Sequence, residues 1–360
     1  MSVPEKNTTP SSTIKPKQAR SLLQSTGLVG IMTLLSRVFG LIRDIVVANL
    51  FGASAGADAF FIAFKIPNFF RRLFAEGAFS QAFIPVLSEY RKTKTESEVR
   101  RLANSVAGVL GGILFVITLL AMLGAQWLTA LFAPGFLEDA EKYALATDML
   151  RITFPYLLLI SMTAMCSAVL NTYDRFAIPA FTPALLNVSL IACSFLLAPY
   201  MREPELALAW GVLVGGFAQL LFQLPFLARI QLVPKPKLSK LHEGVIRIKK
   251  LMLPALFGVS VSQINLLFDT FIASLLVSGS VSWLYFSDRL MELPLGTFGI
   301  AIAIVVLPSL SRRHAEQSME EFSKTLDWAF RLICLIAIPA TLSAAKPPLT
   351  IIPNQPTHNV

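Results

Sequence analysis

The sequence predicts an all-α polytopic membrane protein, and three observations support this fold class. Hydrophobic residues make up 54% of the 360 positions and charged residues only 15%, a composition far more apolar than that of a typical soluble domain. Apolar runs repeatedly exceed the roughly 20 residues that a helix needs to cross a bilayer. Lys and Arg residues gather in alternate loops between these runs, as they do in multi-pass membrane proteins.

The chain begins with a polar segment. Residues 1–20 are rich in Thr, Ser, Pro and Lys, and they are expected to form a disordered cytoplasmic tail. The apolar run that follows contains Arg37, Arg43 and Asp44. The core of a cleaved signal peptide is short and uncharged, so cleavage after this run is not expected.

The membrane spans are expected in the following order. Two helices of membrane length fit within residues 36–85, with 52–56 as the turn between them. Seven further spans follow, and the last of them is weaker and incomplete. Their ranges are 103–132, 144–172, 177–200, 205–228, 251–277, 281–310 and a segment that begins near Phe322.

These spans group into two lobes. The expected domains are the tail (1–20), a six-helix N-terminal lobe (21–230), a basic cytoplasmic linker (231–250), the first helices of a second lobe (251–343) and an irregular tail (344–360). The four prolines from Pro347 onward are incompatible with a further membrane-spanning helix. The second lobe is therefore expected to be incomplete, and the chain to be a fragment or a frameshifted product.

The loop charges predict the orientation. One side of the membrane has only Lys142 and Arg202 as basic loop residues. The other side has twenty, in the segments 1–20, 91–101, 175, 229–250 and 312–324. This bias places the N-terminus in the cytoplasm. The net charge of +9 is thus explained by membrane orientation, and nucleic-acid binding is not expected.

Eight charged residues interrupt the apolar background of residues 36–85. They are Arg37, Arg43, Asp44, Asp58, Lys65, Arg71, Arg72 and Glu76. A charge at bilayer depth costs between about 2.5 and 10 kcal/mol, so these residues cannot all face lipid. Helical spacing predicts that Asp58, Lys65, Arg72 and Glu76 share one stripe with Arg71 beside it. Pro67 is expected to open the helix backbone in the middle of the stripe.

This set contains five cations and three anions, so positive charge remains unbalanced. Ion pairs that hold helices together are one interpretation of these residues. The excess of cations favours the other, which is a cationic recess between helices that receives an anionic ligand.

An internal repeat relates the two halves of the chain. Asp44 recurs as Asp269, Lys65 recurs as Arg289, and the block FIPVLSEYRK recurs as VVLPSLSRRH, with offsets between 223 and 225. Six spans separate the copies, so the halves are expected to have the same orientation, as in some alternating-access transporters. Chance matching of apolar sequence is the alternative.

A charged cluster occurs in the second half. Asp288 and Glu292 flank Arg289 within one helical turn, and the two acids are interpreted as part of a self-neutralised cluster. Arg289 is expected to face a central cavity, because it is the counterpart of Lys65 in the repeat.

Motifs of enzymes and metal sites do not occur in the sequence. There is no H-E-x-x-H and no Gly-rich phosphate loop between a strand and a helix. The three cysteines, Cys166, Cys193 and Cys334, stand alone within spans and are interpreted as packing residues. We expect no catalytic activity, no metal site and no cofactor.

Five segments carry a family resemblance. They are SRVFGLIRD, GADAFF, FKIPNFFRRLFAEGAFSQAFIP, GSVSWLYFSDRLMELP and VLPSLS. These segments resemble the MurJ (MviN) family of lipid II flippases of bacterial inner membranes. The similarity is continuous from about Leu22 to Ala340. It implies a fourteen-span member of the multidrug/oligosaccharidyl-lipid/polysaccharide transporter superfamily, with two six-helix lobes around a hydrated cationic cavity.

The resemblance also implies a substrate and site residues. The substrate would be lipid II, an undecaprenyl-pyrophosphate-linked disaccharide pentapeptide that is moved from the cytoplasmic to the periplasmic leaflet for peptidoglycan assembly. Arg37, Arg43, Arg71 and Arg289 match the family's cavity arginines, and Asp58 matches an acid tied to function. Lys65 and Arg72 are expected to join the substrate site, with Asp44 and Glu76 as further functional acids. Expected partners are lipid II, membrane lipids and cell-wall synthesis proteins.

Two other functions stay open at this point. One is a related exporter of drugs or of other polyprenyl-linked sugars. The other is a membrane protein that does not transport, either a scaffold or an ion pathway that uses the same charges. A scaffold would keep its charges paired and inaccessible, whereas a flippase needs a cavity that admits a bulky headgroup.

Overall fold

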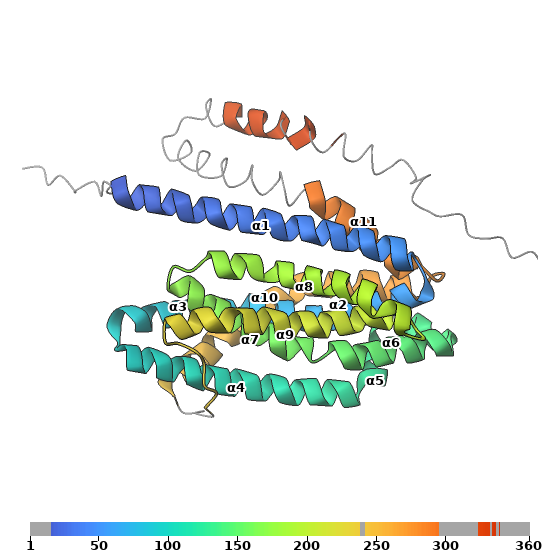
Figure 1. The fold of residues 1–360 in the computed structure, drawn as a ribbon, viewed down its shortest axis with the longest axis horizontal. Helices are drawn as coiled ribbons and strands as arrows, with labels where there is room; N and C mark the ends of the chain where they lie inside the picture. Colours follow the sequence, from blue (N-terminus) through green and yellow to red (C-terminus); the bar gives the residue numbers. More distant parts are fainter. Residues whose placement is uncertain (1–15, 238–241, 295–322, 332, 336–337, 339–360) are drawn as a thin grey trace, which may run out of the picture.

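The computed structural model describes residues 16–237, 242–294, 323–331, 333–335 and 338, and in these residues it contains helices and no strand (Figure 1). The all-α fold class is therefore confirmed. The elements are α1 (Pro16–Phe51), α2 (Ala55–Arg71), π-helix η1 (Arg72–Phe79), α3 (Ser80–Thr93), α4 (Glu96–Leu123), α5 (Ala125–Phe132), 3-10 helix η2 (Pro134–Glu138), α6 (Ala140–Thr153), α7 (Tyr156–Thr172), α8 (Ala177–Leu196), 3-10 helix η3 (Ala198–Tyr200), α9 (Leu206–Arg229), α10 (Glu243–Ser274) and α11 (Ser280–Pro294).

The turn expected at 52–56 is present between α1 and α2. Gly52 has a φ of +59°, a left-handed conformation that glycine adopts without a steric penalty. Ser54 caps α2, because its hydroxyl oxygen accepts a hydrogen bond from the backbone N–H of Ala57 at 3.0 Å. The chain therefore reverses direction here and places α2 antiparallel to α1.

The second helical run is continuous from α2 through η1 to α3. α2 passes through Pro67, and the irregular backbone follows as the π-helix η1, which begins at Arg72. π-Helical turns are rare and occur frequently at functional sites. The irregularity lies next to the charged residues Arg71 and Arg72, one turn later than the position expected from Pro67.

Four helical runs among the described residues are long and apolar enough to cross a membrane. They are Glu96–Leu123, Ala140–Thr172, Ala177–Tyr200 and Leu206–Arg229. α10 adds a fifth if its two parts, which meet at 49°, form one span. α1 and the α2–α3 run are not among these four, and both carry charged residues such as Arg37, Arg43 and Lys65. The protein is therefore a multi-pass membrane protein in which two further helical runs carry charge.

Several sequence expectations concern the ends of the chain. α1 begins at Pro16, so its first residues belong to the stretch that was expected to be a disordered tail up to residue 20. The rest of that tail, the second copy of the repeated block at 305–314 and the tail 344–360 lie outside the described residues.

The helices run roughly side by side, with α1 along one edge of the bundle next to α11 and α4 along the opposite edge (Figure 1). One hydrophobic core lies where α2, α6 and α9 meet, and it includes Ala273 and Val281 from α10 and α11. A second core lies between α3, α4 and α7, and Val245 and Ile248 of α10 belong to it. The helices after residue 242 thus pack on the earlier helices at both ends of the bundle.

Candidate functional site

A cavity of about 510 Å³ lies between α1, α2, α7, α8, α9, α10 and α11. Its walls contain five basic side chains and two carboxylates among the described residues. These are Arg43, Lys65, Arg71, Arg72 and Arg289, with Asp288 and Glu292. The cavity therefore has a net excess of positive charge.

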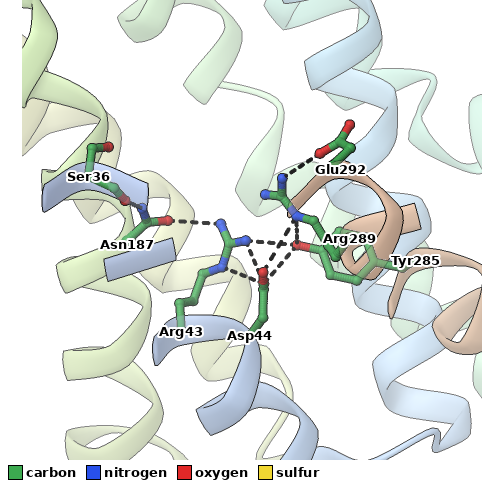
Figure 2. A network of polar contacts seen from close by, with 7 residues as sticks. All are labelled: Ser36, Arg43, Asp44, Asn187, Tyr285, Arg289 and Glu292. Atoms are coloured by element: carbon green, nitrogen blue, oxygen red, sulfur yellow. Dashed lines mark hydrogen bonds and ion pairs between the residues drawn. The ribbon is translucent and has the colours of Figure 1, made fainter. Parts of the chain in front are cut away.

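Arg43 is the centre of a polar network on one wall of the cavity (Figure 2). Its side chain is buried, and the guanidinium is paired with the carboxylate of the adjacent Asp44. It also donates hydrogen bonds to Oδ1 of Asn187 at 2.9 Å and to the hydroxyl of Tyr285 at 3.0 Å. Asn187 in turn donates to the backbone carbonyl of Ser36 at 3.2 Å. The guanidinium is thus held in one orientation by residues from α1, α8 and α11.

Arg289 enters the same network from α11. Its Nε atom lies 3.5 Å from Oδ2 of Asp44 and 3.4 Å from the hydroxyl of Tyr285, which itself donates to Oδ1 of Asp44 at 3.2 Å. A terminal nitrogen of Arg289 is paired with Glu292 at 3.0 Å (Figure 2). Asp44 and Tyr285 therefore bring two guanidinium groups from distant parts of the chain to the same carboxylate.

The remaining cations come from α2 and the start of η1. Lys65, Arg71 and Arg72 line the cavity together with Asn68, whose Oδ1 accepts a hydrogen bond from Nε of Arg71 at 2.9 Å. Lys65 and Arg289, which correspond in the sequence repeat, line the same cavity. The other repeated pair is not alike, because Asp44 is half-buried in the network whereas Asp269 is exposed on α10.

Asp58 does not lie in this cavity, although it was expected in one stripe with Lys65 and Arg72. Its carboxylate is 1% exposed and lies at the end of the bundle where α2 begins. It accepts hydrogen bonds from the backbone N–H of Gly279 at 2.7 Å, and from the N–H and hydroxyl of Ser282 at 2.8 and 2.6 Å. The carboxylate therefore caps the N-terminal turn of α11, where the helix dipole favours an anion.

Lys142 completes this second cluster and was not recognised in the sequence as a site residue. It was counted as a loop residue, yet only 7% of it is exposed. Its ammonium lies 2.8 Å from Oδ2 of Asp58 and 2.9 Å from the hydroxyl of Ser278, and 4.3 Å from the ring centre of Phe136. The available signal was a lone Lys on the side of the membrane that has few basic residues.

Two glycines allow close contact beside this cluster. Gly279 has a φ of +97°, and a Cβ atom there would lie 2.8 Å from the carbonyl oxygen of Ala53. A Cβ at Gly135 would overlap the carbonyl oxygen of Ser274. The helices after residue 242 therefore pack tightly on the earlier part of the chain at this end of the bundle.

The opposite end of the bundle carries the basic loops. There Arg247 of α10 donates a hydrogen bond to Oε1 of Glu89 in α3 at 2.8 Å, and this bond lowers the pKa of Glu89. The connecting segment before α10 also binds the first lobe, since the N–H groups of Lys235 and Lys237 donate to Oδ1 and the backbone carbonyl of Asn104.

The last two expected site residues, Arg37 and Glu76, are not among the described residues that line the cavity. Arg37 is exposed on α1 and is absent from the cavity lining in the described part of the chain. Glu76 belongs to η1, but its side chain lies outside the described residues. Within the described residues no group of three or more His, Cys, Asp and Glu side chains is placed to hold a metal ion.

Comparison with known proteins identifies the family. A family model described as Lipid II flippase MurJ matches residues 47–345. The probable lipid II flippase MurJ of Vibrio cholerae serotype O1 is 51% identical over 344 residues, which are 93% of this chain and 66% of that relative. The corresponding protein of Haemophilus influenzae is 51% identical over 327 residues, 87% of this chain and 64% of the relative. The chain therefore spans slightly less than two thirds of the length of these relatives.

Solved structures agree in fold. A lipid II flippase MurJ in an inward closed conformation superposes with a TM-score of 0.70 at 31% identity, covering 88% of this chain and 64% of that one. An outward-facing multidrug resistance transporter of the MATE family, from the MOP superfamily, superposes with a TM-score of 0.52 at 15% identity, covering 89% and 71%. The fold is that of a transporter bundle with an incomplete second lobe, and the chain belongs to the MurJ family of lipid II flippases.

Proposed function

We propose that the protein flips lipid II, the undecaprenyl-pyrophosphate-linked peptidoglycan precursor, from the cytoplasmic to the periplasmic leaflet of the bacterial inner membrane. The observation that carries the proposal is the cavity in which five cations outnumber two carboxylates. A pyrophosphate has two or more negative charges and many acceptor oxygens, which suit guanidinium groups better than ammonium groups.

The network around Arg43 supports this assignment. Asp44 and Tyr285 hold Arg43 and Arg289 side by side, so two guanidinium groups are oriented before the ligand arrives. Preorganisation of this kind reduces the entropy lost on binding. In our proposal the pyrophosphate is bound by Arg43 and Arg289 from one side and by Arg71 from α2.

The cluster around Asp58 supports an alternating-access mechanism. By the distribution of basic residues this end of the bundle faces the periplasm, and the N-terminus lies in the cytoplasm. The hydrogen bonds from Gly279 and Ser282 to Asp58 close this end. Opening to the periplasm would require these contacts to break, while the lipid tail stays in the bilayer and the headgroup crosses through the cavity.

The proposed activity breaks no covalent bond, so the protein is proposed to be a transporter and not an enzyme. Interaction with cell-wall synthesis proteins would fit a role in supplying the precursor.

The proposal predicts that the cavity distinguishes the pyrophosphate linkage from a monophosphate, since the latter offers fewer oxygens and less charge.

The experiment is a binding measurement with purified protein in lipid nanodiscs. We expect lipid II to bind more tightly than undecaprenyl phosphate, and Arg43→Gln to weaken lipid II binding by about 100-fold, because a bond between charged groups is lost in a partly dry site. Arg91→Gln is the matched control, since Arg91 lies in α3 outside the cavity. Equal affinity for both lipids, or equal effects of the two substitutions, would contradict the proposal.

A further inference from the structure

The buried carboxylate of Asp58 has partners from two parts of the chain. Gly279 and Ser282, at the start of α11, donate three hydrogen bonds to it. Lys142 donates a fourth, and it lies on α6, a helix of the first lobe as α2 is. Opening of this end of the bundle would remove the bonds from α11, whereas the bond from Lys142 can remain.

α2 and α6 are joined to each other by contacts that do not involve α11. The hydroxyl of Thr153 in α6 donates to the backbone carbonyl of Ala63 in α2 at 2.8 Å, and both residues are fully buried. The two helices also contribute to the same hydrophobic core. The pair of Asp58 and Lys142 therefore belongs to the first lobe, and its geometry is set within that lobe.

The ammonium of Lys142 nevertheless contacts the second lobe as well. It donates to the hydroxyl of Ser278, in the turn before α11, at 2.9 Å, and it lies 4.3 Å from the ring centre of the buried Phe136. A carboxylate in a dry site is costly without a cation, whereas the same group in contact with water is not. The charge of Lys142 therefore stabilises the closed end of the bundle more than an open one.

We propose that Lys142 is a positioning residue that acts through Asp58 and sets the balance between the closed and the open state of this end of the bundle. In the closed state it compensates the charge that the first turn of α11 binds. In the open state it remains the counter-ion of Asp58, so α11 can dock again on a carboxylate that has kept its cation. The inference rests on the proposed function, because a transporter has to open this end and a scaffold does not.

The test measures access to the cavity from the periplasmic side. Ala164 lines the cavity and provides the reporter as Ala164→Cys. A membrane-impermeant maleimide is added to intact cells that express the chain, and mass spectrometry of the purified chain identifies the labelled residue. We expect Lys142→Gln to raise the labelling rate of the reporter at least about tenfold, because loss of one partner from a buried ion pair disfavours the closed state. Lys142→Arg should restore the wild-type rate, because it keeps the cation.

Arg151→Gln is the matched control. Arg151 lies on the same helix and forms an ion pair with Asp148 at 2.9 Å, but both side chains are exposed, so the substitution should leave the labelling rate unchanged. Cys166 reports on unfolding, because it is 2% exposed in the second hydrophobic core and should stay unlabelled in every variant. The double variant Asp58→Asn with Lys142→Gln should raise the rate by less than the product of the two single effects, since neither charge is then left alone.

Two results would refute the role of Lys142. An unchanged labelling rate in Lys142→Gln would show that its charge does not govern the closed end, and equal labelling of Cys166 would show a general loosening of the fold. Lipid II binding by the wild-type protein in nanodiscs, measured separately, distinguishes this inference from the proposed function. Tight binding together with either result would leave the proposed function standing, whereas absence of lipid II binding would remove the basis of both.

Discussion

The ammonium of Lys142 in α6 lies 2.8 Å from the carboxylate of Asp58 in α2, and both side chains are almost completely buried. The pair lies against the N-terminal turn of α11, whose Gly279 and Ser282 donate to the same carboxylate. Burial of two charges is costly unless each is paired and hydrogen-bonded, and here both conditions are met. The pair therefore anchors the first helix turn of α11 to the first lobe.

The first prediction concerns this pair. Lys142→Met should destabilise the protein by about 3 kcal/mol, because it leaves the Asp58 carboxylate buried without its cation. The double variant Asp58→Asn with Lys142→Met should lose less than the sum of the two single variants, since neither charge is then left unpaired. Thermal unfolding of purified protein measures both values. Additive losses would show that the two residues are not coupled.

The second prediction concerns Ser282. Ser282→Ala removes the hydroxyl that donates to Asp58 at 2.6 Å, and should cost about 1.5 to 3 kcal/mol, the value for a hydrogen bond to a charged group. The backbone N–H of the same residue still binds Asp58, so the loss should be smaller than that caused by Lys142→Met. Ser97→Ala, on the exposed first turn of α4, is the control and should be neutral. A neutral Ser282→Ala would contradict the closed geometry at this end.

The third prediction uses two glycines. Gly279→Ala should destabilise by about 1 to 3 kcal/mol, because the residue has a φ of +97° and a Cβ would lie 2.8 Å from the carbonyl oxygen of Ala53. Gly258→Ala is the matched control. Gly258 lies within α10, and apart from its chain neighbours and the backbone of its own helix no atom lies within 4 Å of the added Cβ, so alanine there should stabilise by up to about 1 kcal/mol. Equal effects at the two positions would exclude the close approach at Gly279.

The positions of the charged residues show which parts of the fold and of the site can be predicted from the sequence. The composition and apolar runs predict the helical fold, and the turn at 52–56 is visible as a Gly and Ser cluster between two helices. Helical spacing also groups Lys65 with Arg72, and both line the cavity. The same spacing places Asp58 with them, which does not hold, because a period of seven residues along one helix contains no information about neighbouring helices.

The partners of Asp58 explain this difference in physical terms. Lys142 is 84 positions away from Asp58 and Ser282 is 224 positions away, so tertiary packing decides that the carboxylate turns toward them. Tyr285 and Asn187 were missed for the same reason. Each is an ordinary helix residue in the sequence, and only the folded chain brings them to Arg43.

The last prediction concerns Tyr285, whose hydroxyl contacts Arg43, Asp44 and Arg289 at 3.0, 3.2 and 3.4 Å. Tyr285→Phe keeps the ring, which stacks on Phe61 with centroids 4.0 Å apart, and so it should retain the packing of α11 on α2. It removes one of the two groups that contact both guanidinium groups, and the Asp44 carboxylate remains. Affinity for a polyprenyl pyrophosphate should therefore fall about tenfold, while thermal stability changes by less than about 1.5 kcal/mol.

The matched control for Tyr285→Phe is Tyr143→Phe, because the hydroxyl of Tyr143 donates to the backbone carbonyl of Gln126 at 2.7 Å, outside the cavity. It should leave affinity unchanged. Binding of the pyrophosphate measured at two salt concentrations adds a second readout, since a site that keeps both guanidinium groups oriented should lose more affinity with added salt than one that does not. Tyr285→Phe could instead bind the pyrophosphate as tightly as the wild type, with the same salt dependence. The hydroxyl would then have no part in orienting Arg43 and Arg289, and the charge of the ligand alone would have to bring the two guanidinium groups together.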